Sequence, residues 1–268
     1  MRGGQMRVQR ILAPNPSPYT GPGTNTWVMV DQDRCLIVDP GPVIASHRTA
    51  IHAAVEGLTP LGVLVTHTHP DHAPLANPLA TEFEVPAYGH APGPEFSPDI
   101  RLADEDTIWL GSHAVTVLHT PGHAEDHLCF RWGEVLFTGD HIMGGSTVMV
   151  EDMGAYLASL RRLETMTFAR LHPGHGDTID DPARTIRSYL AHRLERERQV
   201  LAAVDSGAAT VGAVVEKVYS EVDPQLHPLA AFSVEAHLLK LAKEGIVTLG
   251  ATPADRWDRA VAPTGVNR

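Results

Sequence analysis

The sequence predicts an α/β domain followed by a smaller, mostly helical module. Short apolar, β-prone runs alternate with helix-like segments through the first two thirds of the chain. After Asp181-Pro182 this alternation stops, and long segments of helical periodicity follow one another. A third observation is that histidines and aspartates come directly after several predicted strands, where the loops of sheet-based enzymes converge.

Periodicity and turn residues mark the elements of the α/β part. Helices are predicted over residues 46–57, where Ile51 and Val55 share a face, and from about Gly154 onward. Turn-forming runs such as Asp39-Pro40-Gly41-Pro42 separate the elements. The predicted strands are Thr26–Val30, Cys35–Val38, Gly62–Thr66, Val85–Tyr88, Thr107–Leu110, Ala114–Leu118, Leu128–Trp132 and Val135–Thr138.

The last third of the chain has a different character. Helices are predicted over residues 183–204, 211–220 and 229–244, and a short strand over Ile246–Leu249. The order helix–helix–helix–strand resembles a winged-helix module. We therefore divide the chain into an α/β domain (1–181), a C-terminal module (182–250) and a flexible tail (251–268).

Composition narrows the class of protein. The 268 residues carry a formal net charge of −11, which argues against a general nucleic-acid-binding surface. There is no run of about 20 apolar residues and no signal-peptide pattern, so we expect a cytoplasmic protein that does not associate with membranes. The two cysteines are too few for a thiolate zinc site and are expected to be buried thiols. No pattern assigns an oligomeric state.

The most unusual feature is the presence of 16 histidines, many of them in the middle of the chain. The densest segment is Thr66-His67-Thr68-His69-Pro70-Asp71-His72, which follows a predicted apolar strand. Alternate residues of an extended segment point the same way, so His67 and His69 can bind one metal ion. Asp71 and His72 follow where the chain turns into a helix, and they can bind a second metal ion. Four ligand-type residues in six positions make a solvated loop the weaker explanation.

Three more ligand candidates lie farther along the chain, and the first two follow predicted strands. His123 ends the turn Thr120-Pro121-Gly122-His123 and is the natural third ligand of the first metal ion. Asp140 follows Phe137-Thr138-Gly139 and supplies a carboxylate, which can bridge two cations. His175, in Pro173-Gly174-His175-Gly176, completes the second site, and His172 is expected to be an unliganded neighbour.

Together the motifs THTHPDH, PGH, GD and PGHG, within residues 24–181, resemble the metallo-β-lactamase superfamily. The resemblance implies an αββα sandwich, in which two sheets pack face to face with helices outside. It also implies the assignment of ligands. The first metal ion is bound by His67, His69 and His123, the second by Asp71, His72 and His175, and Asp140 bridges the two.

A closer likeness is to the lactamase-β-like protein 2 group. The likeness rests on Gly23-Thr24-Asn25-Thr26, on Pro121–His127 (PGHAEDH) and on Ser188–Gln199 (SYLAHRLERERQ). That group carries a winged-helix-like module and includes single-strand-directed endoribonucleases, and fungal relatives act as polyketide thioesterases. The resemblance therefore implies a hydrolase whose substrate is single-stranded RNA or a small-molecule ester or thioester.

The expected cofactor is a pair of Zn²⁺ ions, with iron or manganese as the alternatives. Water held between two zinc ions loses a proton near neutral pH, so a metal-bound hydroxide is the expected nucleophile and Asp71 its orienting base. Two roles are open for Asp39, which either orients a ligand histidine or caps its own Pro-Gly turn. His127 and His141 either contact the substrate or support the ligands.

Five arginines lie close together at the start of the C-terminal module. Arg193 and Arg196 share one face of the predicted helix and are the expected contacts for a polyanionic substrate. Glu195 and Glu197 support the alternative, a solvated helix with internal ion pairs. We favour RNA on the likeness of the motifs, and thioesters, lactones and β-lactams are the alternative substrates.

Three further functions share part of the pattern. A flavodiiron-type oxidoreductase normally carries an acidic residue at the position of His69. A persulfide dioxygenase keeps the histidines but uses a single iron, which metal analysis distinguishes from two zinc ions. A non-enzymatic RNA-binding module has no need of the complete set of ligands.

Overall fold

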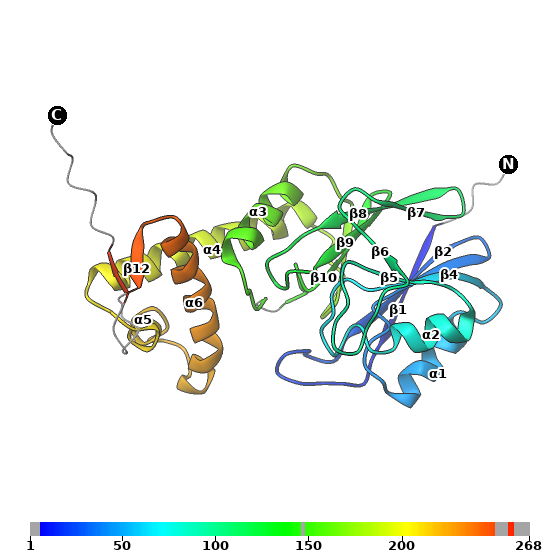
Figure 1. Cartoon of the computed structure of the whole chain (residues 1–268), viewed down its shortest axis with the longest axis horizontal. Helices are drawn as coiled ribbons and strands as arrows, with labels where there is room; N and C mark the ends of the chain where they lie inside the picture. Colours follow the sequence, from blue (N-terminus) through cyan, green and yellow to red (C-terminus); the bar gives the residue numbers. More distant parts are fainter. Residues whose placement is uncertain (1–5, 146–147, 250–256, 260–268) are drawn as a thin grey trace.

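The computed structural model describes residues 6–145, 148–249 and 257–259. They form two facing sheets with helices on both outer surfaces, followed by a small C-terminal module (Figure 1). The αββα sandwich that the sequence predicts is therefore confirmed. Within the described part of the chain, no helix is both long and apolar enough to cross a membrane.

The first sheet consists of β1 (Arg7–Leu12), β2 (Asn25–Asp31), β3 (Arg34–Val38), β4 (Thr59–Leu64), β5 (Ala87–Gly89) and β6 (Ile100–Arg101), in that order. The first three strands are antiparallel neighbours, and β3 to β6 run parallel. The helices α1 (Ala45–Ala54) and α2 (Ala76–Phe83) connect parallel strands, as such connections require. They cover the outer face of this sheet.

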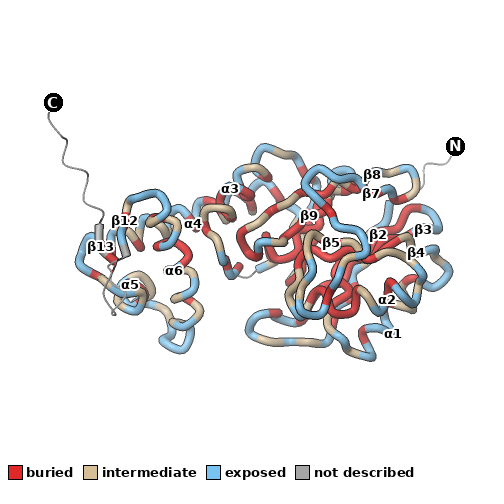
Figure 2. Tube along the Cα trace, viewed as in Figure 1, coloured by how far each residue is buried: buried red, intermediate tan, exposed pale blue. Residues whose placement is uncertain are grey.

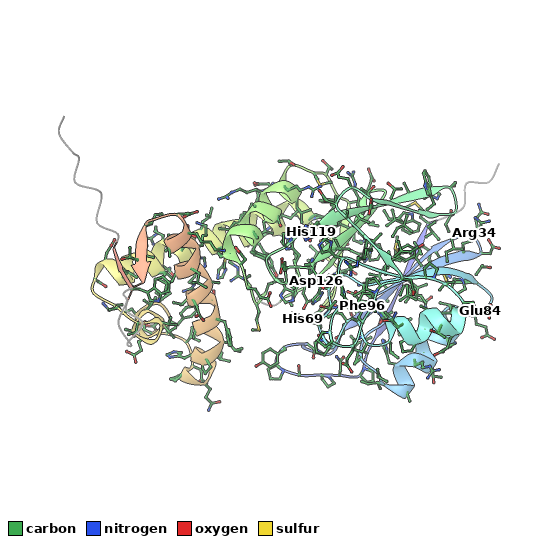
Figure 3. All side chains as sticks on the ribbon, viewed as in Figure 1. Arg34, His69, Glu84, Phe96, His119 and Asp126 are labelled. Carbon is green, nitrogen blue, oxygen red and sulfur yellow. The ribbon has the colours of Figure 1, made fainter. Side chains whose placement is uncertain are left out.

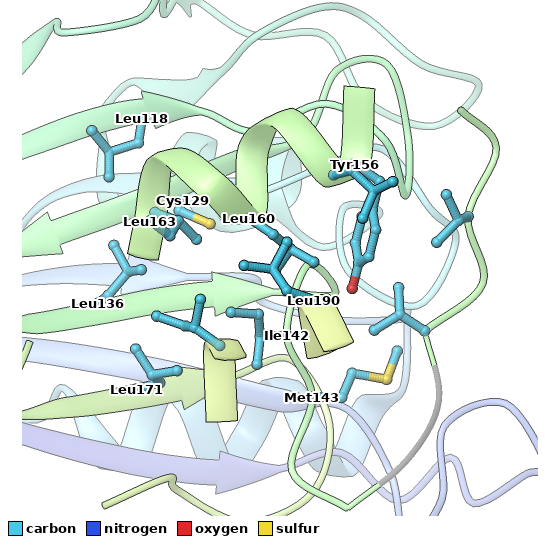
Figure 4. Packing of buried hydrophobic residues seen from close by; sticks show 14 of the residues in the cluster. Leu118, Cys129, Leu136, Ile142, Met143, Tyr156, Leu160, Leu163, Leu171 and Leu190 are labelled. Atoms are coloured by element: carbon cyan, nitrogen blue, oxygen red, sulfur yellow. The ribbon is translucent and has the colours of Figure 1, made fainter. Parts of the chain in front are cut away.

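The second sheet has the order β11-β10-β9-β8-β7. Its strands are β7 (Thr107–Leu110), β8 (His113–His119), β9 (Leu128–Trp132), β10 (Val135–Gly139) and β11 (Arg170–Pro173). The helix α3 (Met153–Glu164) and the first half of α4 (Pro182–Asp205) cover its outer face. Figure 4 shows Leu160 and Leu163 of α3 in the same cluster as Leu136 and Leu171 of the strands.

The side chains of β2 show why the layers hold together. All seven residues of this strand are buried, because both of its faces are covered. Trp27 and Met29 point between the two sheets, while Val28 and Val30 pack toward α1 and α2. Figure 2 shows the same distribution over the molecule, with buried segments along the strands and exposed segments on the loops and outer helix faces.

The C-terminal module contains α5 (Val211–Val218), a 3₁₀ turn (Pro224–Leu226), α6 (His227–Lys243), β12 (Val247–Leu249) and β13 (Trp257–Arg259). The second half of α4 supplies Val200, Ala203 and Val204 to its core. The helix α4 therefore belongs to both hydrophobic cores.

One expectation for the C-terminal end is wrong. Residues 251–268 are expected to form a flexible tail, but residues 257–259 form β13, which pairs antiparallel with β12. Trp257 is buried in the core of the module, and apolar burial of this indole stabilises the strand. The other residues of that stretch lie outside the described part of the chain. The elements β1, β6, β11 and α2 were also absent from the sequence-based expectations.

Polar side chains gather at one end of the sandwich. His69 and Asp126 lie at the end that faces the C-terminal module, whereas Arg34 and Glu84 lie at the opposite end (Figure 3). Loops from both sheets meet at the first of these ends, and the metal-ligand candidates lie on them.

Candidate metal centre

Seven histidine and aspartate side chains converge where strands from both sheets end. The loop after β4 carries four of them, and the turns after β8, β10 and β11 carry one each. They are the residues that the sequence analysis selected: His67, His69, Asp71, His72, His123, Asp140 and His175. His69 and Asp71 are half-buried and the other five are buried, so the group has one open side.

Three imidazole nitrogens surround the first candidate position. Nε2 of His67 lies 3.0 Å from Nδ1 of His69 and 3.2 Å from Nε2 of His123, and the last two atoms are 3.0 Å apart. Two nitrogens bound to one tetrahedral zinc ion at normal bond lengths lie about 3.3 Å apart. Each ring nitrogen of a neutral imidazole is either a donor or an acceptor, so at least two of these three are of the same kind. Hydrogen bonds between the rings therefore cannot explain all three close distances. The arrangement therefore fits a cation.

A carboxylate and two imidazoles surround the second position. Oδ2 of Asp71 lies 3.3 Å from Nε2 of His72 and 3.1 Å from Nε2 of His175. The two nitrogens are 3.3 Å apart. These spacings again match donor atoms around one tetrahedral zinc ion.

Asp140 lies between the two positions. Its Oδ2 is 3.7 Å from Nε2 of His123 and 3.4 Å from Nε2 of His175, and its Oδ1 is 3.4 Å from Nε2 of His72. Oδ1 is buried and has no hydrogen-bond partner among the described residues. A buried carboxylate oxygen without a donor is costly, and a bound cation would satisfy it.

The glycines before these ligands leave room for the group. A Cβ atom at Gly174 would lie 2.5 Å from Oδ1 of Asp140 and 2.7 Å from Cε1 of His72. Gly139 has φ +46°, and a Cβ there would lie 2.6 Å from the Thr66 hydroxyl. The Gly-Asp and Gly-His pairs of the sequence are therefore required by close packing around the ligands.

Backbone carbonyls fix the tautomers of two ligand histidines. Nδ1–H of His123 donates to the carbonyl of Met149 at 2.7 Å, and Nδ1–H of His175 donates to the carbonyl of Gly23 at 3.1 Å. A carbonyl oxygen only accepts, so Nδ1 of each ring carries the proton. In the neutral rings, Nε2 then presents its lone pair to the centre, as a metal ligand must.

Asp39 orients ligands of both positions, which decides between the two roles left open for it. Its buried carboxylate accepts from the backbone N–H and the hydroxyl of Thr66, both at 2.7 Å, and from Nδ1–H of His72 at 2.9 Å. The Thr66 hydroxyl in turn accepts from Nδ1–H of His67 at 2.9 Å. One carboxylate therefore directs His72 itself and, through Thr66, His67.

The segment before β2 holds the other side of the centre. The Thr24 hydroxyl donates to Oδ2 of Asp71 at 2.9 Å, and Asn15 holds Thr24 through two hydrogen bonds. The Asn25 amide donates to the carbonyls of Pro173 and Gly176, which flank His175. Sequence reasoning treated Thr24 and Asn25 only as part of a likeness and missed these contacts.

The neighbouring histidines are buried, and His127 contacts the centre. His127 is fully buried, and its Nε2 accepts from the backbone N–H of Asp140 at 3.1 Å. His141 is fully buried too, with its ring against Tyr156. His172 stacks on Phe137 and lies against Trp27, away from the ligand atoms, as expected of an unliganded neighbour.

The two arginines expected to contact substrate are engaged elsewhere, and this expectation is wrong. Arg193 is 2% exposed, and its Nη2 donates to the carbonyl of Val148. Arg196 stacks over the ring of Tyr219 in the C-terminal module, with 4.2 Å between its Cζ and the ring centroid. Helical spacing placed both on one face, but that face is covered by the α/β domain and the module.

The two candidate positions bind protons differently. Burial lowers the pKa values of His67 and His123. Burial also opposes protonation of His175, but the carboxylates of Asp140 and Asp71 outweigh it and raise its pKa to about 9. The pKa of His72 is likewise raised by these carboxylates against the effect of burial. Without a cation, the second position therefore holds protons at neutral pH.

With the geometry described, the comparison with known proteins decides the family. The sequence pattern of the "Metallo-beta-lactamase superfamily" matches residues 19–175, more than half of the chain. The chain belongs to the metallo-β-lactamase superfamily. Membership and the site together identify it as a hydrolase of this superfamily. The "Beta-lactamase associated winged helix domain" matches residues 210–257, which confirms the winged-helix module of this superfamily protein.

The similarity to known proteins extends over nearly the whole chain. A Drosophila melanogaster protein named "Beta-lactamase-like protein 2 homolog" is 34% identical over 89% of this chain and 88% of its own. An Aspergillus chevalieri protein named "Atrochrysone carboxyl ACP thioesterase" is 34% identical over 88% of this chain and 81% of its own. A solved β-lactamase domain protein from Burkholderia ambifaria has the same fold, with a TM-score of 0.80 at 23% identity, over 97% of this chain and 94% of its own.

The first prediction concerns proton release. Because the raised pKa of His175 leaves a proton that a cation must displace, affinity at the second position should rise with pH up to about 9. Each displaced proton should give about a tenfold gain per pH unit, and the first position should respond little over the same range. Zinc titrations with competing chelators at pH 7, 8 and 9 measure both constants. Equal pH slopes for both ions would contradict this account.

The second prediction concerns Asp39. The variant Asp39→Asn keeps the shape of the side chain but removes the charge that holds His72 and Thr66. Loss of such an orienting partner typically costs about 10–100-fold in metal affinity or activity. We expect both metal ions to bind more weakly while the circular dichroism spectrum stays unchanged. Wild-type affinity for both ions in this variant would show that Asp39 only shapes its turn.

Proposed function

We propose that this chain is a two-zinc hydrolase that cleaves acyl thioesters. The observation that carries the proposal is the set of two three-atom groups, each spaced like donors around one cation, with Asp140 between them. Five imidazoles and two carboxylates suit zinc, which binds nitrogen and oxygen donors in tetrahedral geometry. When bound, two zinc ions polarise a substrate carbonyl and lower the pKa of the attacking water.

Residues of the chain itself orient the reaction. The Asp71 side chain is 25% exposed, so a water molecule at the open side of the centre can donate a hydrogen bond to it. The Thr24 hydroxyl fixes the angle of this carboxylate from the protein side. Asp71 can therefore hold the attacking water in line and receive its proton.

Exposed apolar side chains occur in the segments that support the centre and in the helix α6, which packs beside one of them. Met149, whose carbonyl holds His123, is 39% exposed, and Tyr19, in the loop that holds His175 and Asp71, is 62% exposed. Phe232 of α6 is 56% exposed and lies one helical turn before Ala236, which packs into the same core as Val148 and Val150. In Figure 1 the loop before β2 projects from the sandwich toward the C-terminal module.

The same segments contain no side chain with a permanent positive charge that could bind a phosphate backbone. Residues 13–24, 140–152 and 227–236 include neither lysine nor arginine. RNA binding depends on such cations, so the engaged positions of Arg193 and Arg196 remove the reason for which the sequence analysis favoured RNA. The exposed side chains of Met149, Tyr19 and Phe232 suit an acyl group better than a polyanion. A relative that is 34% identical is named as a thioesterase.

The third prediction tests the reaction. Protein purified without chelators should contain about two equivalents of zinc and hydrolyse acyl thioesters, as expected for a two-metal hydrolase. The variant Asp140→Ala should lose this activity, because it removes the carboxylate shared by both positions, and keep its fold. A panel of lactones, nitrocefin and single-stranded RNA runs in parallel. A single equivalent of iron with oxygen uptake would favour a dioxygenase, and RNA cleavage without thioester cleavage would refute the proposed substrate.

The fourth prediction tests whether Phe232 contacts the acyl group of the substrate. Replacing Phe232 with serine should lower kcat/KM for an octanoyl thioester by about tenfold, because the octanoyl group loses part of its apolar contact area. An acetyl thioester is too short to depend on it and should be hydrolysed as before. Trp109→Ser is the matched control, since Trp109 is 63% exposed but lies on β7 of the sandwich. Equal effects of Phe232→Ser on both thioesters would remove Phe232 from the substrate site.

A further inference from the structure

We propose that Arg193 of α4 positions the metal ligand His123 through the segment Val148–Asp152. The proposal rests on the proposed metal centre. It adds a residue of the helix α4 to those that hold the metal ligands in place. Arg193 contacts the segment rather than the ligand, so it is a positioning residue.

Arg193 is an unusual side chain to find inside a protein core. It is 2% exposed and ranks among the largest fully buried side chains of the described chain. Its guanidinium group lies over the ring of Tyr156, at 5.4 Å from the centroid, and Nη2 donates to the carbonyl of Val148 at 2.5 Å. Among the described residues, its Nε has no acceptor and no carboxylate forms an ion pair with it.

A buried cation in such surroundings is costly for stability. Transfer of a charge out of water is repaid only by good hydrogen bonds and a partner charge, and replacing buried ionic groups by apolar ones is often neutral or stabilising. Stability by itself therefore gives little reason for an arginine at this position. Its specific contact, the carbonyl of Val148, suggests what the guanidinium group does.

The segment that Arg193 holds is in direct contact with the first metal position. The carbonyl of Met149, next to Val148, accepts from Nδ1–H of His123 at 2.7 Å. Farther along the segment, the backbone N–H groups of Glu151 and Asp152 donate to the carbonyl of Gly122, at 2.8 and 3.0 Å. The segment therefore forms hydrogen bonds both with the ring of His123 and with the backbone of Gly122, the residue before it.

The C-terminal part of the chain anchors both ends of this segment. Arg193 holds Val148, and Lys243 of α6 forms an ion pair with Asp152 at 2.7 Å. The ion pair is exposed and contributes little, whereas the contact of Arg193 is buried and geometrically restrictive. Residue 193 lies beyond the stretch 19–175 that matches the superfamily, on the helix α4, whose first half packs against the second sheet.

The test separates positioning from general stability. Apo-protein of the full chain is titrated with Co²⁺, and the two stepwise affinities are measured for wild type, Arg193→Met and Arg193→Lys. In Arg193→Met, one of the two ions should bind about 10–100-fold more weakly, as for other residues that support a ligand histidine. Arg193→Lys keeps a cationic donor, so its affinity for this ion should lie between those of wild type and Arg193→Met. In ¹⁵N spectra of the zinc-loaded protein, the Nδ1–H proton of His123 should exchange faster with water in Arg193→Met.

Two control variants make the outcome decisive. Val234→Ala, in the core of the C-terminal module, should lower Tm without changing either metal affinity. Arg198→Met removes an exposed arginine of the same helix and should change neither property. Wild-type affinities and exchange in Arg193→Met, with a Tm lowered as in Val234→Ala, would overturn the proposal. If Arg193→Met does not fold, Arg193→Lys decides by the same criteria. Wild-type protein that binds no second ion would instead contradict the proposed function.

Discussion

The centre depends on one buried carboxylate, that of Asp39. It accepts three hydrogen bonds, two from Thr66 and one from His72, at the end of the sheet where β3 and β4 run side by side. A charge in this place is tolerable only because every one of these donors is fixed by the fold. The same donors are thereby fixed in return, which sets the direction of a ligand in each metal position. The positions of the strand ends thus determine the orientation of the ligand side chains.

The ligands are held by a second layer of contacts drawn from the whole chain. Gly23 and Met149 fix histidine tautomers through their carbonyls, Thr24 fixes Asp71, and His127 fixes the backbone of Asp140. None of these contacts requires a mobile surface side chain. A set of ligands prepared in this way loses little conformational entropy when a cation binds, which favours tight and specific coordination.

The candidate ligands could be selected from the sequence because their spacing is local. HxHxDH places four donors within six residues, the turns before His123 and Asp140 each follow a recognisable strand, and His175 was selected from its Pro-Gly-His-Gly turn. The layered fold followed from the resemblance. Some supporting contacts were missed because they join residues far apart, such as Thr24 with Asp71. The arginines of α4 were misassigned because helical spacing tells which residues share a face, but not which neighbour covers it. The strand β13 was missed because a three-residue strand has no detectable period.

The hydrogen bonds between Asn25 and the turn at His175 join residues 148 and 151 positions apart. The second position is therefore complete only when the beginning and the end of the α/β domain are in contact. During synthesis on the ribosome, the strands up to β10 emerge and can pair before Gly176 has left the exit tunnel, and non-local pairings of this kind form late. Until then the chain can offer a cation His67, His69 and His123, or His67, His72 and Asp140, but not the group that includes His175. The second candidate position is thus expected to be completed late in the biogenesis of this protein, after the sandwich has closed.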